Sequence, residues 1–491
     1  LSDREKRVTA VEVLEKERLD CEKEVGYLRM EGDFADKKDE ATFYYSYDKK
    51  TWKRIGEPCK MVFDYTKFFM GSKFAIFNYA TKDLGGYVDI DYFDSGNLKV
   101  NRMKLKKCVG IFLFSTLCLN VGAIDHKGIT FDRLAPDRFT LMENGVANEI
   151  LVDEQEDAGV MIAVRNLQND FKRVSGRAAG LCYTPGVKRM IMVGTLKSRY
   201  IRELVKAKKI DASLLEGKNE KYLMTVVSAP LNGVNEALVI AGSDKRGTIY
   251  GIYELSEQIG VSPWYDWADV PVMSRQNLSM TRGSYTAGEP AVKYRGIFLN
   301  DEAPCLTGWV KHTYGTNYGD HRFYARVFEL ILRLSGNFMW PAMWGWSFYA
   351  DDPENSKTAH EMGIIMGTSH HEPMARNHQE WVRKRSEYGA WDYASNQQVI
   401  DRFFREGMER AADTEDLITI GMRGDGDTPM GGKEGEDDKY VPRDEENMRL
   451  MEKIFRNQRR IIKEVTGKVP EKRPQVWAIY KEVQRYYDMG L

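Results

Sequence analysis

Alternating apolar and polar positions predict antiparallel strands in the first part of the chain. Phe43, Tyr45 and Tyr47 alternate with polar residues, and residues 48–50 (DKK) are typical of a turn. The strand after this turn pairs back as a hairpin, and more strands follow it. The later strands are expected over residues 52–55, 73–81 and 87–93. The charged stretch before residue 41 is expected to hold little order, with a short amphipathic helix over residues 8–19 as one option.

A strongly apolar run interrupts this pattern between residues 103 and 123. Met103 is followed by three lysines, then by an apolar stretch over 109–119 and by the small residues 121–123 (VGA). This layout is typical of a secretory signal peptide, and the run is shorter than the ~20 residues of a membrane-spanning helix. A buried strand or short core helix is the alternative. If the leader is real, Met103 is a true start, the mature product is secreted or periplasmic, and the flanking residues come from different proteins or genes.

After the apolar run, strands and helices mix in a pattern that predicts an α+β domain of about 130 residues. Ser198 is a suitable N-cap for a helix, and Gly260 suits the position just after the end of another. Strands are expected over residues 159–164, 189–193 and 237–241, and helices over residues 198–208 and 246–259.

From residue 294 onward, strand and helix patterns alternate regularly. Strands are expected over residues 294–299, 337–343, 363–368, 417–422 and 475–479, with helices including 396–411 and 446–465 between them. Repeated strand–helix units indicate a parallel sheet with right-handed crossovers. About five units fit, whereas a closed (β/α)8 barrel needs eight. The pattern therefore predicts either an open doubly wound sheet or a barrel cut short.

Composition adds limits but no function. The 491 residues have a net charge of −1, with 42% hydrophobic and 30% charged residues, as in ordinary soluble domains. A balanced charge, with no basic run interleaved with aromatic residues, gives no reason to expect nucleic acid as a partner. The six cysteines form no CxxC pair, so neither a disulfide framework nor a structural zinc site is indicated.

Residues that could take part in catalysis or ligand binding follow every strand of the alternating region. The stretches at the five strand ends are 300–302 (NDE), 340–344 (WPAMW), 369–372 (SHHE), 423–427 (RGDGD) and 480–482 (YKE). In such folds the working residues gather where the strands end. Two carboxylates across a pocket suit glycoside hydrolysis, and an arginine beside them suits an anionic sugar. Asp425 and Asp427 as turn-capping acids, Arg423 in a structural ion pair and Trp340 as packing remain the alternatives.

The first region resembles the extreme C-terminal part of glycoside hydrolase family 43 β-xylosidases. The segments that carry the resemblance are 45–52 (YSYDKKTW), 69–71 (FMG), 77–81 (FNYAT) and 85–89 (GGYVD). The resemblance implies a partial accessory β-sandwich without catalytic residues over residues 1–94.

The last region resembles glycoside hydrolase family 115, the xylan α-glucuronidases. The segments that carry this resemblance are 294–304 (YRGIFLNDEAP), 338–345 (FMWPAMWG), 367–374 (GTSHHEPM), 421–427 (GMRGDGD) and 474–483 (PQVWAIYKEV). It covers roughly residue 124 to the end, and implies an inverting hydrolase that removes 4-O-methylglucuronic acid from glucuronoxylan without a metal or organic cofactor. It also implies further barrel strands beyond the last motif, and a homodimer as an option for the complete enzyme.

The family 115 resemblance also implies roles for individual residues. Glu482 and Asp427 match acidic positions implicated in catalysis, and which is acid and which is base stays open. The substrate-binding candidates are Asp301, Arg423 and His370, which match positions of the uronic-acid pocket, and Trp344 on an adjoining loop. The pair His370–His371 with Glu372 lacks the HExxH spacing of a zinc site.

Together these interpretations predict a multidomain chain: a partial β-sandwich, an α+β domain and an incomplete (β/α)8 TIM-type barrel with about five of eight units. The expected divisions are 1–94 (sandwich), 95–102 (linker), 103–123 (leader), 124–275 (α+β) and 276–491 (catalytic). The leading hypothesis is an α-glucuronidase with an incomplete catalytic domain, whose activity is weak or absent in this form. The alternatives are a non-catalytic xylan-binding protein and an inactive gene-model fusion of two enzyme fragments.

Overall fold

The computed structural model describes residues 2–3, 8–9, 26–33, 40–60, 128–342, 344–426, 428–431 and 443–491. The chain divides into two compact units, residues 1–118 and residues 119–491, and each is considered by itself. Within the described residues, no helix is both long and apolar enough to cross a membrane.

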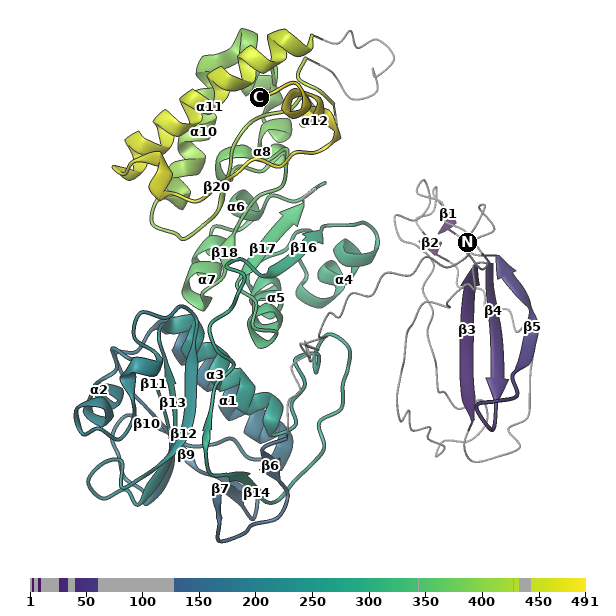
Figure 1. Cartoon of the computed structure of the whole chain (residues 1–491). Helices are drawn as coiled ribbons and strands as arrows, with labels where there is room; N and C mark the ends of the chain where they lie inside the picture. Colours follow the sequence, from purple (N-terminus) through teal and green to yellow (C-terminus); the bar gives the residue numbers. More distant parts are fainter. Residues whose placement is uncertain are drawn as a thin grey trace, which may run out of the picture. The chain divides into compact units, whose positions relative to one another are not determined.

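The first unit contains an antiparallel three-stranded sheet (Figure 1). Its strands are β3 (Tyr27–Asp33), β4 (Glu40–Ser46) and β5 (Lys53–Lys60), in the order β3-β4-β5. Tyr45 lies opposite Lys53, and the Asp48 carboxylate accepts hydrogen bonds from the amides of Lys50 and Thr51 at 2.7 Å. These bonds close the turn and hold the pKa of Asp48 well below its usual range. The predicted hairpin is therefore confirmed.

In the same unit, one predicted helix is wrong, one strand was not predicted, and other predictions fall outside the described residues. Val8–Thr9 is a short strand (β2) paired with Ser2–Asp3 (β1), so a helix beginning at residue 8 is wrong. Strand β3 was missed because it lies in a charged stretch, with three charged residues in its sequence YLRMEGD, and its partner strand supplies the pairing. The strands expected over 73–81 and 87–93 and the leader-like run at 103–123 lie outside the described residues.

The second unit begins with an α+β domain built on a six-stranded mixed sheet. Its strands, in spatial order, are β10 (Leu181–Cys182), β9 (Glu149–Val152), β11 (Arg189–Thr195), β13 (Glu236–Gly242), β12 (Tyr222–Ser228) and β15 (Ser284–Tyr285). A smaller antiparallel sheet consists of β6 (Thr130–Phe131), β14 (Leu278–Thr281), β7 (Arg138–Glu143) and β8 (Val146–Ala147). The central strands β11 and β13 match the expected ones.

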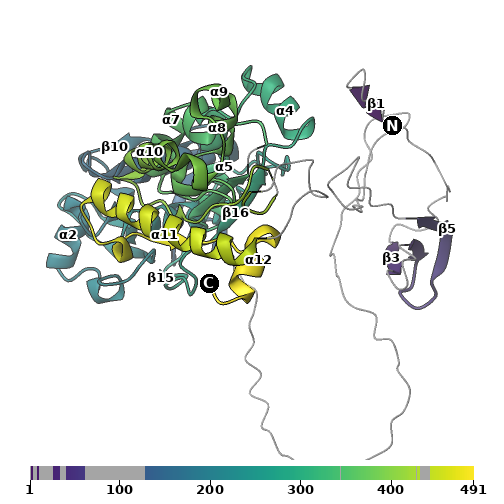
Figure 2. The same ribbon diagram turned by 90° about the horizontal axis from the view of Figure 1, so that it is seen from above.

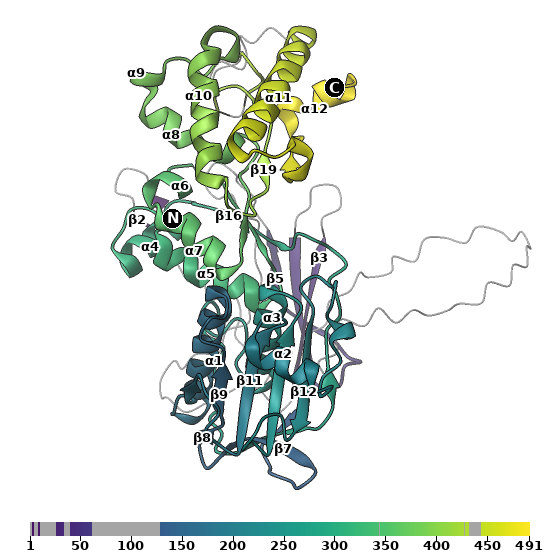
Figure 3. The ribbon, with the colours of Figure 1, turned by 90° about the vertical axis from the view of Figure 1, so that its left-hand side faces the viewer.

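Helices cover both faces of the larger sheet (Figures 1 and 3). They are α1 (Ala158–Ser175), α2 (Arg199–Lys206) and α3 (Lys245–Gln258), with a 3-10 turn at Ala212–Leu214. Alternate residues of β11 point to opposite faces: Ile191 and Val193 join the core under α1 and α3, whereas Met190 and Met192 join the core under α2. The strand therefore has a continuous apolar run because both of its faces are buried.

The helix predictions in this domain are confirmed, and one strand prediction is wrong. Helices α2 and α3 lie where expected, and Gly260 has φ +101° just after α3, a conformation that favours glycine. Residues 159–164 belong to α1 and do not form a strand. Their apolar run continues at helical spacing through Leu167 and Phe171, both fully buried, and the Asp157 side chain caps the helix by accepting from the Gly159 amide at 2.9 Å.

The rest of the second unit alternates parallel strands with helices. The strands are β16 (Gly296–Asn300), β17 (Phe338–Ala342), β18 (Ile365–Met366), β19 (Ile418–Thr419) and β20 (Gln475–Val476). The helices are α4 (Cys305–Tyr314), α5 (His321–Arg333), α6 (Phe348–Asp351), α7 (Glu354–Met362), α8 (His378–Arg383), α9 (Arg385–Tyr388), α10 (Tyr393–Ala411), α11 (Asp444–Thr466) and α12 (Lys481–Asp488). Helices α10 and α11 lie side by side (Figure 2).

All five predicted strands occur, in chain order and parallel. Two ladders are assigned, β16-β17-β18 and β19-β20. They are joined by the Leu417 amide, which donates to the Met366 carbonyl at 2.8 Å. The prediction of repeated strand–helix units is thus confirmed, while the assignment of these units to a (β/α)8 barrel stays a prediction.

Candidate active site

The C-terminal ends of the five parallel strands carry the predicted site residues. Asp301 directly follows β16, and Trp344, His370 and Arg423 lie on the segments after β17, β18 and β19. Glu482 lies in the first turn of α12, just after β20. Because parallel strands end at one edge, the fold gathers these groups from five separate parts of the sequence. Asp427 lies outside the described residues.

Arg423 and Glu482 form a buried ion pair. Nη1 of Arg423 lies 3.2 Å from Oε1 of Glu482, and the two side chains are only 3% and 2% exposed. The Arg423 backbone is also fixed, because its carbonyl accepts a hydrogen bond from Nε1 of Trp391 at 3.1 Å. A charge buried this deeply is tolerated only beside an opposite charge. The pair is therefore a preformed, geometrically defined group at the strand ends.

A small pocket of about 220 Å³ opens at this pair. Its lining residues come from the ends of β18, β19 and β20: His370, Ile420, Met422, Arg423, Trp477, Ala478, Tyr480, Glu482 and Val483. The ring of His370 packs against that of Tyr480, with centroids 4.7 Å apart. Three of the predicted site residues, His370, Arg423 and Glu482, thus line one cavity. Tyr480 and Trp477 were not predicted as lining residues, although they belong to the motif that contains Glu482.

Asp301 holds a neighbouring loop. Its buried carboxylate accepts hydrogen bonds from the backbone amides of Trp344, Gly345 and Trp346 at 2.6 to 2.7 Å. These bonds fix the segment after β17, from which the Trp344 side chain projects with 57% of its surface exposed. Asp301 therefore lies at the predicted edge of the fold but does not line the pocket, and its visible contacts are with the loop.

The Asp425 carboxylate is paired with two neighbouring side chains. Its carboxylate accepts from Nε2 of His378 at 3.0 Å and pairs with the Arg385 guanidinium, and these two partners hold the pKa of Asp425 well below its usual range. The Asp425 carbonyl also accepts from the Thr428 hydroxyl at 2.9 Å. The carboxylate thus pairs with side chains of α8 and α9, and the turn-acid interpretation of Asp425 stays a prediction.

Glu372 is a feature that sequence reasoning did not assign to the site. It is fully buried, accepts from the Asn377 side-chain amide at 3.0 Å and from the Ser369 backbone amide at 3.2 Å. Burial raises the pKa of Glu372 to about 8, and the nearby charge of Asp301 adds to this effect. The sequence showed an acid after a strand, but no pattern indicated that it would be enclosed.

Three buried polar atoms at the ends of the first strands have no hydrogen bond within the described part of the chain. They are Oδ1 of Asn300, Nε1 of Trp340 and Oγ of Ser369. Buried polar groups are nearly always bonded, so these three atoms are among the exceptions in the described residues. Among the described residues, no group of three or more His, Cys, Asp or Glu side chains could hold a metal ion.

Comparison with known families assigns both ends of the chain. Residues 287–491 match the model of glycosyl hydrolase family 115, and residues 2–95 match that of the β-xylosidase C-terminal concanavalin A-like domain. No curated protein sequence matches the chain at a significant level.

Among solved structures, the chain is similar to BtGH115A, described as a family GH115 4-O-methyl-α-glucuronidase with specificity for decorated arabinogalactans. The identity is 32% and the TM-score 0.61, and the match covers 72% of this chain and 44% of that chain. The chain thus spans less than half the length of this relative. A mutant Streptomyces plicatus β-hexosaminidase (8% identity, TM-score 0.41) and a GH20 β-N-acetylhexosaminidase from Streptomyces coelicolor A3(2) (9%, 0.38), each covering 68% of this chain and 62% of its own, are too distant to carry an argument.

These matches agree with the two resemblances found in the sequence, but the family 115 model begins at residue 287 and leaves the resemblance of residues 124–286 a prediction. The same segment that carries the five strand-end motifs carries the family 115 match. Residues 287–491 are therefore similar to glycosyl hydrolase family 115, and residues 2–95 are similar to the β-xylosidase C-terminal concanavalin A-like domains.

Proposed function

We propose that the second unit carries the active site of an inverting α-glucuronidase, which removes 4-O-methylglucuronic acid or glucuronic acid from xylan. The observation that carries this proposal is the buried Arg423–Glu482 pair in the lining of the strand-end pocket. It places a carboxylate suited to acid–base work beside a cation suited to a uronic acid.

Hydrolysis with inversion needs two carboxyl groups with different tasks. One protonates the glycosidic oxygen as the bond breaks, and the other removes a proton from the water that attacks the opposite face of the sugar. Glu482 and Asp427 are the proposed pair, with the assignment of acid and base left open. Their carboxyl groups would stand ~6.5 to 9.5 Å apart, which leaves room for the water molecule.

The remaining pocket residues would bind and orient the sugar. The guanidinium of Arg423 presents parallel N–H donors that match the uronic-acid carboxylate, a geometry that a lysine would not offer. His370, held against the Tyr480 ring, would contact the sugar hydroxyls. Trp344 offers an exposed indole face for the xylan backbone, on the loop that Asp301 anchors.

A conservative substitution tests the proposal. Glu482→Gln keeps the shape but removes the ionisable group, and should lower the release of 4-O-methylglucuronic acid from glucuronoxylan by about 10² to 10⁴-fold. Glu452→Gln, an exposed glutamate of α11, is the matched control and should not change the rate. An NMR time course should show that the anomeric configuration of the released sugar is inverted. Unchanged activity of Glu482→Gln would refute the assignment.

A second substrate has its own support. BtGH115A is described as specific for decorated arabinogalactans, so glucuronic acid on an arabinogalactan is the alternative to xylan. Parallel assays on the two polysaccharides decide between them. Binding of xylan without release of any sugar, by the same preparation, would favour the non-catalytic xylan-binding alternative.

Export and assembly stay predictions. N-terminal sequencing of the protein from its native source would show whether cleavage follows residue 123, as a leader at 103–123 requires. Sedimentation of the native protein would test the homodimer.

A further inference from the structure

The opposite ends of the same strands form a second and larger pocket. It encloses about 740 Å³ and is lined by Arg246, Lys293, Tyr294, Ile365, Ala412, Thr414, Glu415, Thr466, Lys468, Lys472, Arg473 and Pro474. Most of these residues lie just before β16, β19 and β20, whereas Arg246 comes from α3 of the α+β domain. This pocket is larger than the one at the C-terminal ends of the strands.

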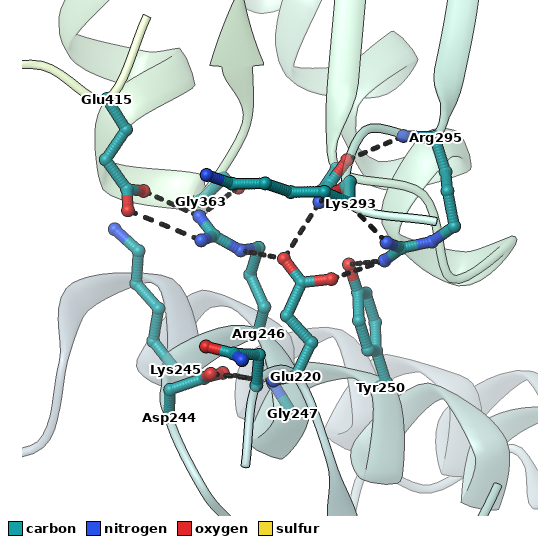
Figure 4. Close-up of polar contacts among 12 residues, drawn as sticks. Glu220, Asp244, Lys245, Arg246, Gly247, Tyr250, Lys293, Arg295, Gly363 and Glu415 are labelled. Atoms are coloured by element: carbon teal, nitrogen blue, oxygen red, sulfur yellow. Dashed lines mark hydrogen bonds and ion pairs between the residues drawn. The ribbon is translucent and has the colours of Figure 1, made fainter. Parts of the chain in front are cut away.

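The lining is strongly basic. It contains five cationic side chains and one acidic one, Glu415. Arg246 is neutralised: its guanidinium donates to Glu220 at 2.6 Å and to Glu415 at 2.6 Å (Figure 4). Glu220 also pairs with Arg295, so it is shared between two cations. The single acid of the lining is thus already occupied.

Arg473 is held by neutral groups. Its guanidinium donates to the backbone carbonyls of Thr414 at 2.7 Å and Ala411 at 2.8 Å. The buried Asp416 interacts with its charge from a distance. Arg473 therefore acts as a fixed, partly compensated cation in the wall.

Three lysines supply the excess charge. Lys293, Lys468 and Lys472 are exposed, and within the described residues none of them has a carboxylate within ion-pair distance. Lys293 extends beside the Arg246–Glu415 pair (Figure 4), with its amine 5.2 Å from the ring of Tyr294. Like charges held together without partners raise the local concentration of anions.

We propose that this pocket is a second binding site for an acidic oligosaccharide, one that carries two or more uronic-acid carboxylates. The ligand class rests on the proposed function, since the polymer would bear such groups along its length. The lysines would meet the carboxylates, and Tyr294 and Pro474 would offer apolar faces to the sugar rings. Holding one part of a polymer here while another part occupies the strand-end pocket would raise the overall affinity without new contacts at the reacting bond.

The test uses the full chain with Glu482→Gln, so that the ligand is not cleaved. Titration calorimetry with a xylo-oligosaccharide bearing two 4-O-methylglucuronic acid groups should detect two sites. Adding Lys468→Glu and Lys472→Glu should abolish one site or weaken it by roughly tenfold or more, and the glutamine variants at both positions should have a smaller effect. The matched control is Lys453→Glu with Lys463→Glu, two exposed lysines of α11 outside the pocket.

Several outcomes would overturn this proposal. Two unchanged sites in the doubly reversed variant, with its thermal unfolding intact, would show that the lysines bind nothing. Equal binding of neutral xylotetraose would show that charge is not used. Displacement of the oligosaccharide from this site by an equimolar amount of inorganic phosphate would show a general anion site. Hydrolysis by the chain with Lys468→Glu and Lys472→Glu, on a substrate with a single uronic acid, should match that of the unaltered chain, so failure of the proposed function would be seen separately.

Discussion

The two ends of one set of parallel strands differ in how their charged side chains are buried and paired. At the C-terminal ends, Arg423 and Glu482 are both buried and stand 3.2 Å apart. At the N-terminal ends, Lys468 and Lys472 are exposed and, within the described residues, have no carboxylate within ion-pair distance. A buried charge needs an oppositely charged partner within the fold. An exposed charge is solvated by water and can bind a ligand of opposite charge. The first end is thus suited to fixed chemistry, and the second to attraction of anions.

Removal of the Arg423 cation at the C-terminal ends of the strands should have the largest effect on unfolding free energy and on activity. Arg423→Met leaves Glu482 buried without its ion-pair partner, which typically costs about 3 to 5 kcal/mol of unfolding free energy. Release of glucuronic acid should fall by at least about 10²-fold, because the uronic-acid carboxylate loses its cation too. Denaturant unfolding and a glucuronic-acid release assay measure the two effects.

Arg405→Met is the control for that experiment. Arg405 is 38% exposed and pairs with Glu464 on the surface, so its loss should cost at most about 1 kcal/mol. Equal costs for the two variants would remove the contrast between buried and exposed charge.

Asp301→Asn should have the next largest effect on unfolding free energy. The amide replaces one acceptor oxygen by a donor that faces the backbone amides of Trp344 to Trp346. Unsatisfied buried groups of this kind cost about 1 to 3 kcal/mol, which denaturant unfolding would detect. Asp266→Asn, at an exposed ion pair, is the control. An Asp301→Asn variant with the same unfolding free energy as the unaltered chain would contradict the anchoring role.

Glu372 should give the fold a pH dependence. Its pKa is raised from 4.5 to about 8 by burial, so the folded state keeps a proton that the unfolded chain has lost. Between these two values, unfolding free energy should therefore fall as pH rises, by at most about 1.4 kcal/mol per pH unit from this group. Glu372→Gln cannot ionise and should flatten that slope.

Asp416 offers an internal comparison, because burial raises its pKa from 3.8 to about 6. Asp416→Asn should flatten the slope only below about pH 6, whereas Glu372→Gln should act up to about pH 8. Identical pH profiles of unfolding free energy for the unaltered chain and Glu372→Gln would show that Glu372 ionises normally.

The smallest effect is expected at the N-terminal ends. Glu415→Gln removes one partner of Arg246, but the glutamate is 49% exposed, so unfolding free energy should change by less than about 1 kcal/mol. The same change removes the only acid in the lining of the basic pocket. Binding of the acidic oligosaccharide should therefore strengthen a fewfold, as calorimetry would measure. Weaker binding would show that Glu415 contacts the ligand directly.

Periodicity determined much of the second unit. The strands at β11, β13 and β16 to β20 and the helices α2, α3, α10 and α11 all lie close to their predicted positions, because burial of a strand face or helix stripe imposes a repeat that the sequence must show. The error over residues 159–164 arose where a short apolar window fits both repeats. Only the full length of α1, with Leu167 and Phe171 continuing the helical stripe, resolves it.

By itself the sequence determined the family resemblance, the order of the strands and the end of the strands at which the polar residues lie, because motifs and periodicity are local along the chain. The tertiary structure decided which of these residues meet. It pairs Arg423 with Glu482 and hydrogen-bonds Asp301 to the backbone of the loop after β17. It also buries Glu372 and places lysines from separate segments around one pocket. Burial and distance between remote segments set pKa values and ion pairs, and neither quantity can be read from the sequence around a single residue.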